Sequence, residues 1–263
     1  MDFAAIDWQR PWLAHLRELG LTLASSPDWI QTANQLARQR ELRNAVGLPV
    51  GFVSQDQLPE GTAYEAHIYA TGQVPTRDNL HDFFNALIWL HFPQVKRMLN
   101  QLQAMEILRR QACSSDEGTR GGQRDAATLF DENAALFIST DAVLIDALRQ
   151  HQWKQVLQKD PELFASTCAV LLFGHALIEK LVVPYKAITA HTWCMLVDTS
   201  QLHMVSDKQM TSLDHRLASE IASGFASADF GHLPVLGVPG WWLGQDDAFY
   251  DDSSVFRPLR RRQ

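Results

Sequence analysis

The segment LHDFFNALIWLH, residues Leu80–His91, has the apolar spacing of a helix with one buried face. Its apolar side chains fall on that face: Leu80, Phe83, Phe84, Leu87, Ile88 and Leu90. The other face carries His81, Asp82 and Asn85, with Trp89 among them. Because a large aromatic residue is disfavoured on a water-facing stripe, we expect this polar face to be covered and to form a pocket wall. The alternative is a hydrogen-bond network that only stabilises the fold.

A second segment, Leu171–Val183, is apolar at most positions, yet it holds His175 and Glu179 one helical turn apart. This spacing presents an imidazole and a carboxylate to one point, as a metal ion or a proton-transfer pair requires. Gly174 directly before the histidine permits close approach of another backbone. A buried His–Glu hydrogen bond that only fixes the packing is the alternative here.

Composition limits the classes of protein and partner. The chain has 263 residues, 46% hydrophobic and 20% charged, which is an ordinary globular balance. The formal net charge of -7 argues against a broad basic surface for nucleic acid. There is no uninterrupted apolar run of about 20 residues for a membrane span. Three cysteines without a Cys-x-x-Cys pair (Cys113, Cys168 and Cys194) fit a reducing compartment. We therefore expect a cytoplasmic protein that binds neither nucleic acid nor membrane, and the sequence is silent on oligomeric state.

The element pattern predicts one α+β domain over residues 1–263, mostly helical with small antiparallel hairpins, and leaves open an N-terminal helical annex over residues 1–45. Helices are expected over Trp8–Leu19, Asp28–Arg43, Leu80–His91, Gln94–Gln111, Asp141–Arg149, Gln152–Gln158 and Asp207–Ser223. Strands are expected over Val50–Ser54, Ala63–Ala70, Asp125–Phe130, Ala134–Ser139 and Thr189–Val197. Leu163–Phe173 fits either a strand or, as we prefer, the front of a helix that ends near Pro184. Ser114–Gln123 is expected to be a loop.

The predicted hairpin of Asp125–Phe130 and Ala134–Ser139 turns at Asp131-Glu132-Asn133, where acidic and amide side chains are ordinary turn chemistry. Asp125 is different, because a charge on an otherwise apolar hairpin needs a partner. Near the C-terminus, Arg257 can bind a carboxylate or phosphate in a fork or can clamp the tail. The chain has no glycine-rich phosphate loop, no Gly-x-Gly-x-x-Gly and no Gly-x-Ser-x-Gly, which argues against nucleotide motors, Rossmann dehydrogenases and typical serine hydrolases.

Several separated motifs, in this order, resemble one uncharacterised bacterial family, catalogued as domain of unknown function 3025. They are Thr76-Arg77, His81-Asp82-Phe83-Phe84-Asn85, Arg124-Asp125 with Thr128 and Asp131-Glu132-Asn133, Phe173-Gly174-His175-Ala176 with Glu179-Lys180, Gly237-Val238-Pro239-Gly240-Trp241, Phe249-Tyr250 and Phe256-Arg257-Pro258. The resemblance runs from about Tyr64 to Pro258 and departs at Ala134, where family members often have glycine. It implies no activity, substrate or catalytic residue.

Our leading hypothesis is an enzyme in which five side chains converge on one pocket as the catalytic set: His81, Asp82, Asp125, His175 and Glu179. Of these, His81, His175 and Glu179 would hold a divalent metal ion, Zn, Mn or Fe, that activates water for hydrolysis. A small anionic substrate would be bound by Arg77, Asn85, Arg124, Lys180 and Arg257. One metal ion cannot join His81 and His175 if their side chains lie more than about 10 Å apart.

Two other functions are compatible with the same residues. The first is a non-catalytic binding or scaffold module, in which the buried polar residues form a structural network. The second is a metal-free acid–base enzyme that uses His175 and Glu179.

Overall fold

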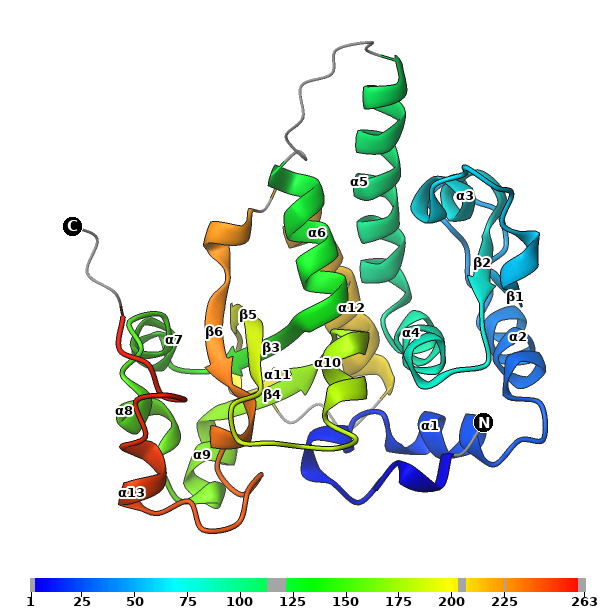
Figure 1. Ribbon diagram of the computed structural model, residues 1–263. Coiled ribbons are helices and arrows are strands. Elements are labelled where there is room, and N and C mark those ends of the chain that lie inside the picture. Colours follow the sequence, from blue (N-terminus) through cyan, green and yellow to red (C-terminus); the bar gives the residue numbers. More distant parts are fainter. Residues whose placement is uncertain (1–2, 113–121, 203–206, 225, 260–263) are drawn as a thin grey trace.

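The computed structural model describes residues 3–112, 122–202, 207–224 and 226–259 (Figure 1). Its α-helices are α1 (Arg17–Ala24), α2 (Trp29–Gln39), α3 (Tyr64–Thr71), α4 (Leu80–His91), α5 (Pro93–Ala112), α6 (Gly122–Asn133), α7 (Ala142–Arg149), α8 (Trp153–Leu157), α9 (Pro161–Thr167), α10 (His175–Lys180), α11 (Thr199–Leu202), α12 (Asp207–Ala222) and α13 (Asp247–Tyr250). Its strands are β1 (Gly51–Ser54), β2 (Gln73–Thr76), β3 (Ala134–Ser139), β4 (Cys168–Leu172), β5 (Thr189–Leu196) and β6 (Gly231–Pro234). The α+β, mostly helical class is confirmed.

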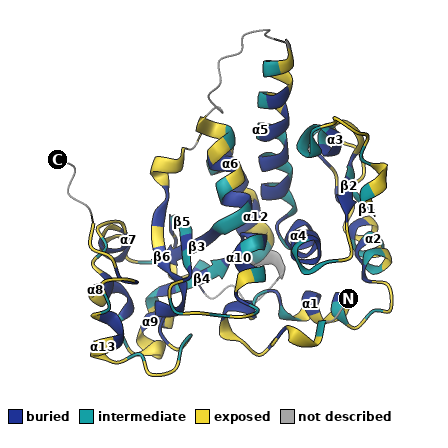
Figure 2. Ribbon diagram, viewed as in Figure 1, coloured by how far each residue is buried: buried dark blue, intermediate teal, exposed yellow. Residues whose placement is uncertain are grey.

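The larger sheet has four strands in the order β4-β3-β5-β6. β3 runs antiparallel to β4 and parallel to β5, and β5 runs antiparallel to β6. Every residue of β3 is buried, as Figure 2 shows in dark blue, because this central strand is covered on both faces. Its sequence, AALFIS, is apolar except for the final serine, which is typical of such a strand.

Helices enclose this sheet and bring distant segments together. α7 packs on β3, β5 and β6, while α6 packs on β3 and β5. Beyond α6, the long helix α5 lies beside α3, α6 and α12, and the short helix α10 lies between α4 and α6 (Figure 1). The contact of α10 with α4 and α6 positions the site described below.

The N-terminal segment and α2 pack on α4 through aromatic side chains. The rings of Trp8 and Trp29 lie 6.4 and 5.4 Å from the ring of Phe83. The indole of Trp29 also donates a hydrogen bond of 2.8 Å to Asp78, just before α4. Residues of the predicted N-terminal annex therefore belong to the same hydrophobic core as α4.

Local sequence signals explain where α4 and α5 begin. The side chain of Asn79 accepts a hydrogen bond of 2.8 Å from the backbone N–H of Asp82, which caps α4. Pro93 occupies the first position of α5, where its missing N–H costs nothing. The next two free N–H groups, those of Gln94 and Val95, donate to Asp214 of α12 at 2.8 and 3.0 Å. A side chain of α12 therefore caps the N-terminus of α5.

The structure confirms the predicted helices at α4, α5, α7, α8 and α12 and the predicted strands at β1, β3 and β5. Other boundaries differ. Only a 3-10 turn at Pro11–Leu13 and α1 cover the predicted helix Trp8–Leu19. The helix predicted to reach Arg43 ends at Gln39, because Glu41 has a left-handed φ of 51°.

Two predicted strands were wrong. Ala63–Ala70 is not a strand but helix α3, which ends at Gly72 with a left-handed φ of 74°. β1 instead pairs in parallel with β2. Asp125–Phe130 is not a hairpin strand but part of α6, where Ala126 and Phe130 are buried one turn apart.

The preferred helix through Leu163–Phe173 was also wrong. Helix α9 ends at Thr167, and Cys168–Leu172 forms β4 against β3. The apolar run alone could not decide this, because the partner strand lies in a distant part of the sequence. Most of the predicted loop Ser114–Gln123, together with Cys113, lies outside the described residues. Among the described helices, none is long and apolar enough to cross a membrane.

Candidate metal centre

His81 lies in the first turn of α4 and points toward α10. Its Nδ1 lies 3.0 Å from Oε2 of Glu179, and its Nε2 lies 3.1 Å from Nε2 of His175. The side chain of His81 is 32% exposed and that of Glu179 is 38% exposed. The predicted approach of His81, His175 and Glu179 is therefore present, and the two imidazoles lie far closer than the limit of about 10 Å for a shared ion.

His175 is the first residue of α10 and is only 3% exposed. Its Nδ1 lies 2.8 Å from the backbone carbonyl oxygen of Asp131, at the end of α6. Its Nε2 lies 3.6 Å from Oε2 of Glu132. Burial lowers the pKa of His175 to about 4, so the ring is neutral at neutral pH and can act as a ligand.

The hydrogen-bond partners assign the protons of both rings. A backbone carbonyl only accepts, so Nδ1 of His175 carries the hydrogen and donates to Asp131. The carboxylate of Glu179 likewise accepts from Nδ1 of His81. When both rings are neutral, each Nε2 atom carries a lone pair, and the two lone pairs face each other across 3.1 Å. A cation between them would remove that repulsion.

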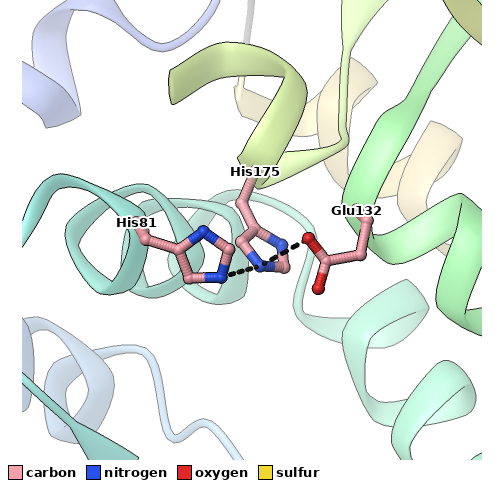
Figure 3. A group of neighbouring side chains, drawn as sticks. All are labelled: His81, Glu132 and His175. Carbon is pink, nitrogen blue, oxygen red and sulfur yellow. Dashed lines mark hydrogen bonds and ion pairs between the residues drawn. The ribbon is translucent and has the colours of Figure 1, made fainter. Parts of the chain in front are cut away.

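Glu132 completes the group that we call the ion cluster, which consists of His81, Glu132 and His175 (Figure 3). One ligand atom from each residue lies within 4.8 Å of the others. Around a tetrahedral zinc ion, ligand atoms lie about 3.3 Å apart. The N–N distance of 3.1 Å and the N–O distance of 3.6 Å are close to that value. The side chain of Glu132 is 41% exposed, so the cluster is open to solvent on one side.

Groups around Glu132 shift its pKa in opposite directions. Burial, followed by the charge of Asp131, raises the pKa of Glu132, and His81, Lys96 and Lys180 oppose this rise. A metal ion on the carboxylate would favour its ionised form.

A network of buried polar side chains connects to the ion cluster through Asp131. Lys96, which is 4% exposed, donates to Asp131 at 2.5 Å and to Asn85 at 2.8 Å. Asn85 in turn donates to the hydroxyl of Tyr64 at 3.1 Å. Burial alone would raise the pKa of Asp131, but the nearby cation Lys96, through its charge and its hydrogen bond, opposes this, and the pKa is lowered. Asp131 is therefore a buried carboxylate whose backbone orients His175.

The other predicted catalytic carboxylates do not join the cluster. Asp82 is buried and accepts hydrogen bonds from Arg77, through the backbone N–H at 2.6 Å and through Nε at 3.0 Å. Its role here is to fix the entry to α4. Asp125 is exposed in the first turn of α6, seven residues before Glu132 and thus about 10 Å away along the helix.

The predicted substrate-binding residues are dispersed. Asn85 belongs to the buried network, and Arg77 pairs with Asp82. Arg124 is half-buried in the first turn of α6. Lys180 is exposed at the end of α10, and exposed Arg257 donates to the backbone of Ser254. Lys180 and Arg257 line a separate pocket.

Sequence reasoning missed Glu132 and Lys96. Glu132 was assigned to turn chemistry because its segment was predicted as a hairpin. A helical interpretation of that segment places Glu132 in the last turn, next to the residue whose carbonyl binds His175. The amphipathic pattern Ala126, Ala127 and Phe130 was the available signal. For Lys96 no signal existed, since a lysine in a helix is usually solvated.

The fold and the ion cluster define an α+β protein with a candidate metal centre of two histidines and one carboxylate. The model of the family described as protein of unknown function (DUF3025) matches residues 50–260, and the chain belongs to this family. The resemblance found in the motifs is thereby confirmed. No curated protein and no solved structure matches the chain.

Proposed function

We propose that the chain binds one divalent metal ion, Zn, Mn or Fe, at His81, Glu132 and His175, and that the ion activates water to hydrolyse a small anionic substrate. The observation that carries the proposal is the pair of facing Nε2 atoms, 3.1 Å apart, whose Nδ1 atoms are both committed to acceptors. Two imidazole nitrogens and a carboxylate oxygen form a set that suits these ions.

The hydrolytic part rests on coordination and access. Three protein ligands leave at least one position for water, and an ion there lowers the pKa of that water toward neutrality. Glu132 and His81 are partly exposed, so a substrate can reach this position. An anionic substrate suits this centre because a divalent cation attracts and polarises anionic oxygen groups.

In this arrangement Glu179 supports His81 instead of binding the ion. It contacts Nδ1, the ring nitrogen opposite the cluster. A carboxylate in this position fixes the ring orientation and makes the ligand nitrogen more basic.

The first test is metal content. Protein purified without a His tag is expected to carry close to one ion per chain by elemental analysis, and its melting temperature should fall when a chelator removes the ion. His175→Asn keeps an N–H near the Nδ1 position but removes the ligand nitrogen, so it should lose the ion. His215→Gln, at an exposed histidine of α12, is the matched control. No bound metal, and no shift in melting temperature with added Zn, Mn or Fe, would reject the metal site.

The second test separates hydrolysis from metal binding alone. The loaded protein is expected to hydrolyse the anionic ester p-nitrophenyl phosphate, and the chelated protein and His175→Asn are not. Bound metal without any hydrolysis would favour a metal-stabilised binding module.

One observation favours a second candidate. Glu179, His81 and His175 form a continuous chain of hydrogen-bonding groups that could carry a proton without metal. In that case one Nε2 carries a shared proton, and NMR would detect an imidazolium at neutral pH in metal-free protein.

We also propose a cytoplasmic location. Among the described residues, Cys168 and Cys194 are free thiols, buried and half-buried respectively, which suits a reducing compartment.

A further inference from the structure

A second pocket lies on the sheet side of α10, with a volume of about 700 Å³. Its walls are the start of β5, the neighbouring strand β6, the segment after α10 and the C-terminal residues 254–259. Helical geometry separates it from the ion cluster. At 100° per residue, Lys180, which lines the pocket, points about 140° away from His175 around α10. Asn133, which also lines it, points about 100° away from Glu132 around α6.

The polar wall of this pocket is basic. The side chains that carry basic nitrogen are Lys180, Arg257, His151, His191 and His232. Among the described residues that line the pocket there is no aspartate or glutamate. A protein with an overall charge of -7 therefore concentrates cationic and potentially cationic groups in one cavity.

The three histidines are held close together by the fold. His191 and His232 are paired across β5 and β6, with ring centres 5.4 Å apart. His151 lies 5.6 Å from His232 and has a left-handed φ of 56°, a strained conformation for this residue type. Burial and a neighbouring imidazole lower the pKa of both His191 and His232. An anion among these rings would offset their mutual repulsion when they are protonated.

The remaining wall is apolar and partly flat. The ring of His151 stacks on Trp153 at 4.6 Å with an interplanar angle of 29°. Ile188 and Val255 complete this surface. A cavity with a flat apolar wall and a basic wall suits a ligand that has both an apolar body and an acidic group.

We propose that this pocket binds a small organic anion, with its acidic group at Lys180 and Arg257 and its apolar body against Trp153 and Val255. The proposal does not depend on the ion cluster, because the two sites use different residues and lie on different flanks of α10.

The test uses the aromatic sulfonate 1-anilinonaphthalene-8-sulfonate as the probe, in the full-length protein. Calorimetry is expected to give close to one binding site per chain. Lys180→Gln and Arg257→Gln should each weaken binding by roughly tenfold, the effect of losing one charge-assisted hydrogen bond. Arg149→Gln removes an exposed charge outside the pocket and is the matched control. Circular dichroism and melting curves identify any variant that fails to fold.

Two further binding experiments test which chemical groups of the ligand the pocket recognises. The neutral analogue N-phenyl-1-naphthylamine should bind more weakly than the sulfonate, because it lacks the acidic group. Benzoate and phenyl phosphate at millimolar concentration should displace the probe, and the stronger competitor identifies the preferred acid. Equal binding of the neutral analogue, unchanged affinity in both pocket variants, or failure of both competitors would overturn the proposal.

Discussion

At the residue scale, the property that matters is which nitrogen of each imidazole carries the hydrogen. His81 and His175 both use Nδ1 to donate, to Glu179 and to the carbonyl of Asp131. Their Nε2 atoms are thereby directed at each other and at Glu132. The acceptors at Nδ1 thus fix the orientation in which both Nε2 atoms would bind the proposed ion.

Glu179→Gln tests this orientation without removing a ligand of the cluster. The amide keeps an acceptor for Nδ1 of His81 but loses the negative charge. We expect affinity for the ion to fall about 10- to 100-fold, as measured by competition with a chelating dye. Glu162→Gln, at an exposed position of α9, should leave affinity unchanged. Equal affinity in wild type and Glu179→Gln would contradict a supporting role for Glu179.

Lys96→Met tests the buried network beneath the cluster. Asp131 would remain buried without its cation, so the free energy of unfolding in urea should fall by about 3–5 kcal/mol. Adding Asp131→Asn removes the unpaired charge and should recover part of this loss. Strictly additive effects of the two substitutions would mean that Lys96 and Asp131 are not coupled.

At the scale of elements, the cluster depends on how closely α10 approaches the end of α6. Gly174 precedes α10, and a Cβ there would collide with the backbone of Asn133 and Ala134. The backbone φ of Gly174 is -61°, an ordinary value, so glycine is required here for space and not for conformation. This contact sets the distance between Glu132 and His175.

Gly174→Ala should therefore push α10 away from α6. We expect a loss of about 1–3 kcal/mol in the free energy of unfolding, together with weaker ion binding. Gly122→Ala is the control, because a Cβ at Gly122 has nothing within 4 Å. If both alanine variants behave alike, the close approach of α6 and α10 does not support the site.

At the scale of the whole molecule, Asp214 joins α12 to α5 and makes the stability depend on pH. Burial raises the pKa of Asp214 to about 6, although the N–H groups of Gln94 and Val95 oppose this. In the unfolded chain the pKa is about 3.9. Between these values the folded protein binds the extra proton, so this group's contribution to stability falls as pH rises from about 4 to about 6.

Asp214→Asn removes this titration. Relative to wild type, the free energy of unfolding of the variant should rise by on the order of 2 kcal/mol between pH 4 and pH 7. Urea unfolding at several pH values measures this difference. Parallel stability curves for the two proteins would show that Asp214 titrates normally.

Much of this architecture follows from local sequence. The helices α4, α5, α7, α8 and α12 were predictable, since apolar periodicity and caps such as Asn79 and Asp141 act over a few residues. His81, His175 and Glu179 were identifiable for the same reason, because each is an ionisable residue within an apolar helical pattern.

Only the tertiary structure decided the rest. Whether Cys168–Leu172 is a strand depends on β3, and whether Glu132 faces His175 depends on α6 being a helix that ends against α10. His81 and His175 lie 94 positions apart, so no local pattern could determine their contact. The hydrophobic periodicity of a segment indicates which of its side chains are buried. It does not indicate which other segment they pack against, because that depends on the folded chain as a whole. The sequence by itself determined which side chains needed partners, and packing determined which partners they met.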